Sequence, residues 1–527
     1  MQGQLATIKE ASDWASDYLK KEISSSNISY LIQYGKVQKH QTNGSVFIDL
    51  EDLKKYYLSF LGNRELHWKE KLGKDLNWAL SFDYLREKDT TKHVHRLHPY
   101  KGKFIPQLVQ YFLDDHVDEF KTQVYFKKGD IVLDPFAGSG TTLVQANELG
   151  LHSIGIDISR FNCLISEVKL HDYDFLRLEE EIRSILNSVT AFEAENNIKS
   201  FENELYRDLN LFNTKYFPSP SFKYRVYRKE IDENEYGKEK GKEFLVIYHQ
   251  LILKYKIELL QNSQKTFLDK WYINNIRKEI NYAFGLVKKI KDTKNKRILA
   301  VILSRAIRSC RATTHSDLAT LKSPQITTYY CYKHKKICKP LFSIKDMFLK
   351  YANDSLARLK SFDKLKIAAY WHLQSEDSRT VNIFEKIKER HKNFYEILKK
   401  QKISGIFTSP PYVGQIDYHE QHAYAYDLMG FDRKDEFEIG RLYNGQGLDA
   451  REFYIRGIAD VLINCKKYLA SNFNIFLVAN DKYNLYPNIA ELADLKIVNK
   501  FKRPVLNRTE RDKSPYSEII FHLKARL

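Results

Sequence analysis

The feature that most constrains the fold of this chain is the stretch 131–159, IVLDPFAGSGTTLVQANELGLHSIGIDIS. A short apolar run stops at Asp134, passes through Gly138 and Gly140, and continues into a helix-forming segment before a second apolar run ends in Asp157. The pattern predicts strand, tight turn, helix and strand, and the glycines allow a ligand to approach the backbone where the helix begins. An acid about twenty residues after the glycines stands where nucleotide-binding folds place an acceptor for ribose hydroxyls.

A second predicted strand ends in a turn of unusual composition. The segment IFTSPPY places Ser409, two prolines and Tyr412 directly after the apolar residues. Because open α/β sheets bind ligands outside the carboxyl ends of their strands, the two turns predict one shared site. Two ordinary strand-to-helix turns are the alternative.

Further strand patterns complete the predicted fold. They lie at 365–373, at 474–481 and on both sides of a basic loop near the C-terminus. With helices between them, these segments predict an α/β fold with an open, mostly parallel, doubly wound sheet of seven strands, whose last pair forms an antiparallel hairpin.

The words DPFAGSGTT, GIDIS and TSPPY, in this order, resemble the motifs of the DNA amino-methyltransferases, which methylate exocyclic nitrogens of bases. The likeness covers about 93–160 and 365–525, implies a Rossmann-like fold and implies S-adenosylmethionine as cofactor. It places Phe136 against the methionine part, Asp157 on the ribose, and Asp377, with Glu376 as its rival, at the adenine. The implied cofactor residues are Lys103, Phe104, Asp134, Pro135, Phe136, Gly138, Gly140, Thr141, Asp157 and Asp377. For Lys103 and Phe104, a solvated lysine and a core phenylalanine are an equal alternative.

The same resemblance implies that Ser409, Pro410, Pro411 and Tyr412 are catalytic. Ser409 and the Pro410 carbonyl would accept the two N–H bonds of the target amine, and Tyr412 would stack on a base flipped out of the duplex. In the family, serine at the first position is typical of N4-methylcytosine enzymes, whereas aspartate or asparagine is typical of N6-methyladenine enzymes. We therefore expect a site-specific cytosine-N4 methyltransferase of a restriction-modification system, with N6-adenine as the alternative. An RNA guanine-N2 methyltransferase and a non-catalytic DNA-binding regulator are further alternatives, which Ser409 and the intact motifs respectively disfavour.

The N-terminal residues 1–75 predict helix, turn, helix, a hairpin about Asn43-Gly44, and a third helix. This order resembles the small winged helix-turn-helix modules of DNA binders, in which the second helix, 27–34 here and capped by Ser25 or Ser26, enters the major groove. The candidate DNA contacts are Asn27, Tyr30, Lys36 and Lys39. A helical cap on the catalytic core is the alternative.

Between the catalytic segments 90–160 and 365–527, the chain carries a long insertion, 161–364. It reads as charged helices around a linker-like run near 217–243, and it is the candidate target-recognition region; a helical scaffold or dimerisation domain is the alternative. Arg305, Arg308 and Arg311, spaced by three, are predicted to share a helical face that lines the DNA or cofactor cleft. A solvated basic face is the bland alternative.

Within the insertion, Cys331-x2-His334-x3-Cys338 has metal-ligand spacing, and Cys310 or His315 could complete a tetrahedral set. The sequence thus offers a structural zinc site, against the alternative that these cysteines are small core residues.

Composition agrees with a nucleic-acid partner. The chain has 527 residues and a formal charge of +18, and aromatic residues make up 13%. Lysine and arginine displace counterions from phosphates and aromatic faces stack on bases, which predicts double-stranded DNA as partner, alongside a possible cognate restriction endonuclease. A Lys-rich composition without a specific partner is the alternative.

The sequence shows neither a membrane span nor a signal peptide, and five irregularly spaced cysteines fit a reducing compartment, so we expect a cytoplasmic protein.

Overall fold

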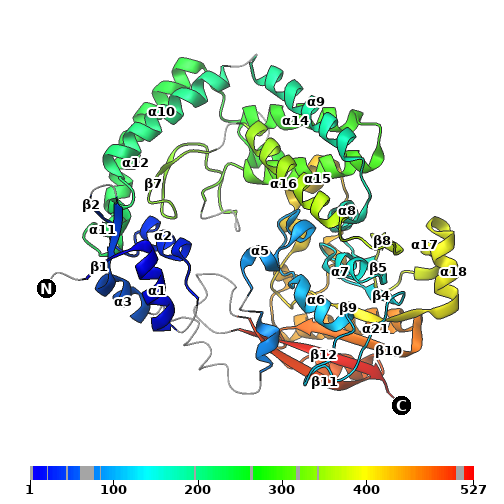
Figure 1. Ribbon diagram of the computed structural model, residues 1–527. Coiled ribbons are helices and arrows are strands. Elements are labelled where there is room, and N and C mark those ends of the chain that lie inside the picture. The colour runs from blue at the N-terminus through cyan, green and yellow to red at the C-terminus, as the bar shows by residue number, and fades with distance from the viewer. Residues whose placement is uncertain are drawn as a thin grey trace. The chain divides into compact units, whose positions relative to one another are not determined.

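The structure is a computed structural model, and it describes residues 4–19, 22–42, 45–59, 76–82, 85–194, 197–261, 265–315, 321–340, 343–505 and 516–526 (Figure 1). The chain forms two compact units. The N-terminal unit comprises Met1–Trp68, Ser188–Ile280 and Cys310–Ile344, and the sheet unit comprises Lys69–Asn187, Asn281–Ser309 and Lys345–Leu527. The predicted insertion 161–364 is therefore divided: 188–280 and 310–344 belong with the N-terminal module, and the rest belongs with the catalytic segments.

The sheet unit is built on seven strands in the order β11-β12-β10-β9-β4-β5-β8. Their bounds are β4 Ile131–Asp134, β5 His152–Ile156, β8 Trp371–Gln374, β9 Ile403–Thr408, β10 Leu469–Ala479, β11 Leu495–Pro504 and β12 Ser517–Ala525. Neighbours from β10 to β8 are parallel, whereas β12 runs antiparallel to both β10 and β11. The predicted open α/β sheet with an antiparallel last pair is thus confirmed.

Strand order identifies where a ligand can bind. From β4 the chain adds β5 and β8 on one side and then returns to add β9 and β10 on the other. The order therefore reverses between β4 and β9, and such a switch point is where doubly wound sheets open a crevice at their carboxyl edge. Only the last part of the segment expected at 365–373 is strand, since β8 begins at Trp371.

Helices cover both faces of this sheet. Successive residues of a strand point to opposite sides, so a strand that is apolar throughout must be covered on both faces. On β4, Ile131 and Leu133 join one hydrophobic cluster, and Val132 joins the other. The first cluster includes residues of α17 Ile383–Arg390, α18 Lys392–Gln401, α21 Leu448–Lys466 and α22 Tyr486–Leu492. The second includes residues of α6 Pro106–Leu113 and α7 Thr141–Glu148.

A further group of helices belongs with the sheet unit. It contains α5 Glu87–Thr90, α8 Arg160–Leu170, α15 Thr293–Ser309, α16 Lys345–Asp363, α19 Tyr418–Gln421 and α20 Ala423–Met429, while α9 Phe175–Ala194 and α14 Asn274–Lys289 span the unit boundaries. Here α15 packs against α8, α16 and α20, so part of the predicted insertion is built into the catalytic unit.

The N-terminal unit begins with β1 Leu5–Thr7, α1 Ile8–Leu19, α2 Ser25–Gln33, β2 His40–Thr42, β3 Ser45–Asp49 and α3 Leu50–Leu58. The strands form a small antiparallel sheet in the order β1-β3-β2, and a hydrophobic cluster links it to the three helices. Ser24 caps α2, in place of the predicted Ser25 or Ser26, because its side chain and that of Asn27 form a reciprocal capping box. The predicted Asn43-Gly44 turn lies outside the described residues.

The same unit contains α10 Ile198–Tyr216, α11 Ser221–Tyr227, α12 Glu233–Tyr255, α13 Phe267–Trp271 and a two-stranded hairpin of β6 Tyr329–Cys331 and β7 Lys336–Cys338. The run expected to be linker-like at 217–243 is largely helical, since Asp232 caps a long α12. Across the described residues, no helix combines the length and the apolar character that crossing a bilayer requires.

Candidate active site

A pocket lies at the carboxyl ends of β4, β5, β8 and β9, and its empty space, with the open mouth included, is about 810 Å³. Its walls include nine of the ten predicted cofactor residues: Lys103, Phe104, Asp134, Pro135, Phe136, Gly138, Thr141, Asp157 and Asp377. Ser409 and Pro411 line the same pocket. The sheet therefore brings together two motifs that are about 270 residues apart in the chain.

The glycine turn between β4 and α7 needs both of its glycines. Gly138 and Gly140 have φ values of 49° and 75°, in the left-handed region that side chains disfavour. A Cβ at Gly140 would lie 2.8 Å from the Ser166 Cβ of α8, so α8 can approach only glycine. Gly140 itself is not among the pocket-lining residues; it shapes the turn from behind.

Asp157 holds this turn in place. Its carboxylate accepts hydrogen bonds from the Gly138 N–H at 2.7 Å, the Ser159 N–H at 2.8 Å and the Asn162 Nδ2 at 3.1 Å. Burial raises the pKa of Asp157 to about 6, although these donors oppose the increase.

Asp134 connects the cofactor turn to the strand that carries the tetrapeptide. It accepts a hydrogen bond from the Thr408 hydroxyl of β9 at 2.6 Å and another from the Phe136 N–H at 3.1 Å. Burial raises the pKa of Asp134 to about 6 as well. Because the tetrapeptide Ser409–Tyr412 begins at the residue after Thr408, this bond fixes the two halves of the site to each other.

The predicted adenine acceptor has a strong partner of its own. Burial pushes the pKa of Asp377 upward, but bidentate hydrogen bonds from Arg379, with Nη2 to Oδ2 at 2.6 Å, keep it below its ordinary value. Glu376, the rival residue, lines the pocket beside it.

Lys103 and Phe104, the first two predicted cofactor residues in the chain, also line the pocket. The Lys103 ammonium donates to the His95 carbonyl, and burial lowers its pKa to about 8. Phe104 packs edge to face on Phe407 of β9, with ring centroids 5.5 Å apart, so it contacts the core and also lines the pocket.

The tetrapeptide residues occupy distinct environments. The Ser409 hydroxyl donates to the Val478 carbonyl of β10 at 3.0 Å, and the Tyr412 hydroxyl donates to Glu518 of β12 at 3.1 Å. Pro410 is buried, whereas Pro411 lines the pocket. Both polar side chains are thus tied to the strands beyond β9.

Several pocket residues were not singled out from the sequence. Tyr100 stacks on Tyr418 with ring centroids 5.6 Å apart, and Asn162 donates to the Tyr100 hydroxyl at 3.3 Å. Glu438 accepts the Tyr418 N–H at 3.1 Å. All four line the pocket, and they come from four separate segments. The only sequence signal was that Tyr100 lies within 93–160, the first stretch that the resemblance covers.

The predicted DNA contacts divide into two groups. Asn27, Tyr30 and Lys39 are exposed in the N-terminal module, and the half-buried Lys36 lies over the Tyr227 ring at 4.9 Å. Gly35 packs against the backbone of α11, so the end of α2 is partly covered, while its outer polar face is not.

The arginines of the insertion do not share a helical face as predicted, because α15 ends at Ser309, before Arg311. Arg305 is buried and binds Asp354 of α16 at 2.6 Å, which gives it a structural role in place of the predicted one in a cleft. Arg308 is half-buried on α15, and Arg311 is buried in the other unit.

Of the predicted metal ligands, Cys331, His334 and Cys338 lie together, and His315 completes the group. Cys310 lies elsewhere, with its Sγ 3.7 Å from the Ser343 carbonyl oxygen.

The chemistry of the pocket suits S-adenosylmethionine. Aromatic and aliphatic side chains line the pocket, and the buried Ser139 hydroxyl and Asn162 Oδ1 have no hydrogen-bond partner among the described residues. A ligand that carries a sulfonium and an ammonium group complements a wall rich in carboxylates, which are Asp134, Asp157, Glu376, Asp377 and Glu438. With the switch point between β4 and β9, these features fit the Rossmann-like fold of S-adenosylmethionine-dependent methyltransferases.

Comparisons with known proteins identify the family. A family model described as DNA methylase matches residues 19–168. The Type II methyltransferase M.MjaII of Methanocaldococcus jannaschii is 48% identical over 529 residues, which cover 99% of this chain and 97% of that protein. The Type II methyltransferase M.BsoBI of Geobacillus stearothermophilus is 29% identical over 223 residues, which cover 38% of this chain and 42% of that protein. The chain therefore belongs to the DNA amino-methyltransferase family.

Proposed function

We propose that this protein is a Type II modification methyltransferase that transfers a methyl group from S-adenosylmethionine to the exocyclic N4 of cytosine in double-stranded DNA. One observation carries the proposal: Ser409 and Pro411 line the same pocket as Gly138 and Asp157. The relatives named above, both Type II methyltransferases, support the restriction-modification setting.

The orientation of Ser409 supports its role as an acceptor. Its hydroxyl proton is directed at the Val478 carbonyl, 3.0 Å away, so its oxygen presents lone pairs to the pocket. A target amine needs acceptors, because its nitrogen becomes tetrahedral and more acidic as it attacks. The Pro410 carbonyl is the second acceptor, and proline offers no competing N–H at that position.

Bound S-adenosylmethionine would supply an electrophilic methyl group to the amine nitrogen, and its sulfur would leave as a thioether. Asp157 would accept hydrogen bonds from the ribose hydroxyls, and Asp377 or Glu376 would accept one from the adenine amine. Lys103 and Phe104 bound the methionine end. The amine loses its proton to solvent after it becomes cationic, so a strong base is not required.

The base must leave the duplex to reach this pocket, because its amine is inaccessible within the stack. We assign Tyr412 to stack on the flipped base, with its hydroxyl fixed by Glu518. The exposed outer face of α2, with Asn27, Tyr30 and Lys39, is our candidate for the major groove, and the chain's positive charge favours the phosphates.

Expression in a methylation-free bacterial host tests the proposal directly. After digestion of the host DNA to nucleosides, mass spectrometry should detect N4-methylcytosine, and the variant Ser409→Ala/Tyr412→Ala should leave none. N6-methyladenine would keep the enzyme and refute the choice of base. No modified DNA base, with cofactor binding intact, would refute the assignment of DNA as substrate.

A further inference from the structure

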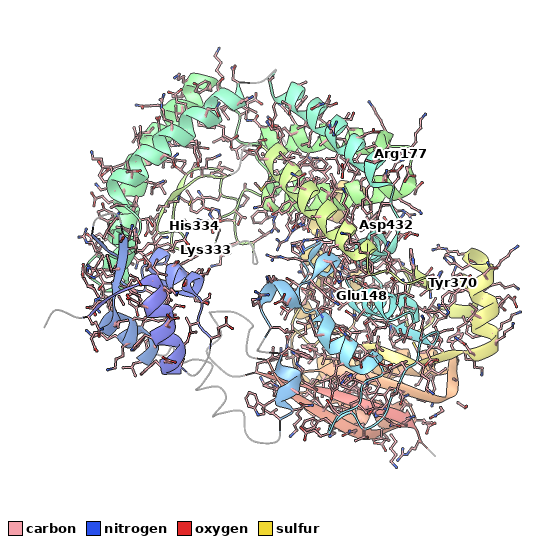
Figure 2. All side chains as sticks on the ribbon, viewed as in Figure 1. Glu148, Arg177, Lys333, His334, Tyr370 and Asp432 are labelled. Atoms are coloured by element: carbon pink, nitrogen blue, oxygen red, sulfur yellow. The ribbon has the colours of Figure 1, made fainter. Side chains whose placement is uncertain are left out.

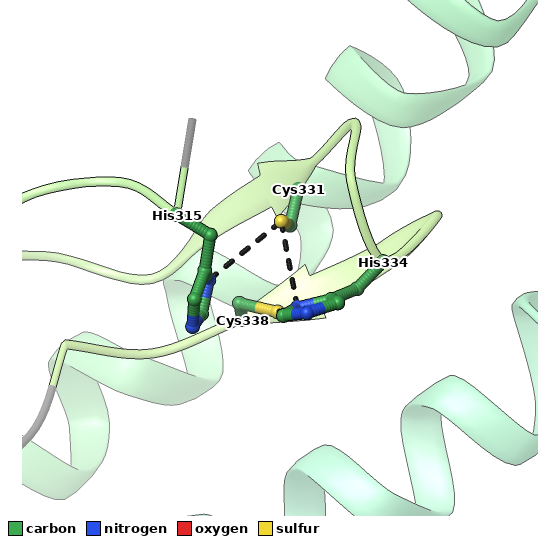
Figure 3. A group of neighbouring side chains, drawn as sticks. All are labelled: His315, Cys331, His334 and Cys338. Atoms are coloured by element: carbon green, nitrogen blue, oxygen red, sulfur yellow. Dashed lines mark hydrogen bonds between the residues drawn. The ribbon is translucent and has the colours of Figure 1, made fainter. Parts of the chain in front are cut away.

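Four side chains that could bind a metal ion converge in the N-terminal unit (Figure 3). Cys331 and Cys338 end the strands of the β6–β7 hairpin, His334 lies in its turn, and His315 comes from the loop after α15. Their ligand atoms all lie within 4.8 Å of one another. Figure 2 shows His334 beside Lys333 at the tip of this hairpin.

The spacing is that of a tetrahedral zinc site. Zn–S bonds of about 2.3 Å and Zn–N bonds of about 2.0 to 2.1 Å place neighbouring sulfur and nitrogen ligands about 3.6 Å apart. The Cys331 Sγ lies 3.7 Å from the His315 Nδ1 and 3.6 Å from the His334 Nδ1. The Cys338 Sγ lies 3.5 Å from the same His334 nitrogen.

We propose that His315, Cys331, His334 and Cys338 bind one structural Zn²⁺. Two thiolates and two imidazoles select zinc over magnesium or calcium, which prefer oxygen ligands. Four protein ligands leave no open position for water or substrate, so the metal has a structural role.

The hairpin around the site explains what the metal stabilises. Each strand has three residues, and an isolated two-stranded hairpin of this size is marginally stable. Asn213 of α10 holds one side through two hydrogen bonds to the Ile337 backbone, at 2.9 and 3.0 Å. Gly237 of α12 leaves room for the Tyr330 ring, because a Cβ there would lie 2.6 Å from it. The zinc fixes the other side, where it joins the His315 loop to the hairpin.

A second cluster, His93, His95 and Glu148, lacks this character. The Lys92 ammonium already binds Glu148 at 2.6 Å, and the Lys103 ammonium donates to the His95 carbonyl. Because the Lys92 ammonium already pairs with the one carboxylate of that cluster, we assign no metal to it.

Metal analysis of the purified full-length protein tests the proposal. We expect about one zinc per chain, released when a mercurial blocks the thiols, and a tetrahedral visible spectrum when cobalt replaces zinc. An iron or metal-free protein, or a disulfide between Cys331 and Cys338 in protein purified without oxidant, would overturn it.

Variants identify the ligands. Cys338→Ser and His315→Asn should lose at least 90% of the bound zinc, whereas Cys310→Ser, a matched change in the same segment, should retain it. Circular dichroism verifies that each variant is folded. Loss of zinc from Cys310→Ser, or its retention by a folded His315→Asn, would refute the assigned set. A variant that fails to fold leaves the wild-type cobalt spectrum as the deciding measurement.

Discussion

The role of Ser409 can be tested by removing one atom, its hydroxyl oxygen. Ser409→Ala removes the oxygen that we assign as acceptor and leaves the backbone and the Pro410 carbonyl in place. A hydrogen bond to a group that becomes cationic is worth about 1.5 to 3 kcal/mol. Since each 1.36 kcal/mol changes a rate tenfold, the methyl-transfer rate should fall about 10- to 150-fold.

Single-turnover transfer of labelled methyl groups to DNA measures this step without product release. Cofactor affinity, measured by calorimetry, should change less than about threefold, because the missing bond forms to the base. Ser409→Thr, which keeps a hydroxyl, should recover most of the rate.

The matched control lies on the same strand. Ser404, near the amino end of β9, accepts the Ile131 N–H at 3.4 Å, away from the pocket. Ser404→Ala and Ser409→Ala each remove one hydrogen bond of about 1 kcal/mol from the fold, so stability alone should affect both equally. If Ser409→Ala methylates DNA within threefold of the wild-type rate, or if Ser404→Ala slows transfer as much, the acceptor argument fails.

Three further predictions concern the pocket and its supports. Burial raises the pKa values of Asp134 and Asp157 to about 6, and a bound cation lowers them. Cofactor binding should therefore release protons, and the affinity for the cofactor should increase about tenfold from pH 5.5 to 7.5. Calorimetry in buffers of different ionisation enthalpy measures both quantities, and an affinity that does not change with pH would contradict this prediction. Gly140→Ala should destabilise the fold by roughly 2 to 4 kcal/mol, because both its φ of 75° and its close neighbour oppose a Cβ, whereas Gly129→Ala, with a φ of 88° and nothing within 4 Å, should cost only about 1 to 2 kcal/mol in urea unfolding. Asp354→Ala should lower the free energy of unfolding by roughly 2 to 4 kcal/mol, because it leaves the buried Arg305 without this carboxylate. Equal midpoints of the variant and the wild type in thermal unfolding would contradict the structural role of the Arg305–Asp354 pair.

Local chemistry made much of the fold predictable. Apolar runs that end in Asp134, Asp157 and Ser409 predict strands, because β-branched residues favour extended backbone and the following glycine and proline residues stop it. The C-terminal hairpin followed from the same pattern. Strand limits were less certain: 365–370 is apolar but lies outside β8.

The motifs could be predicted from the sequence alone, because the glycine turn, the acid after it and the tetrapeptide each depend on residues close together in the chain. Which side chains from distant parts of the chain come into contact depends on the tertiary structure. In the structure, Tyr100 stacks on Tyr418, and Arg305 binds Asp354 instead of lining a cleft. His315, and not Cys310, lies beside the cysteines of the hairpin. The physical reason is that such contacts depend on how helices and loops pack, and packing is a property of many weak, long-range interactions that no local pattern encodes.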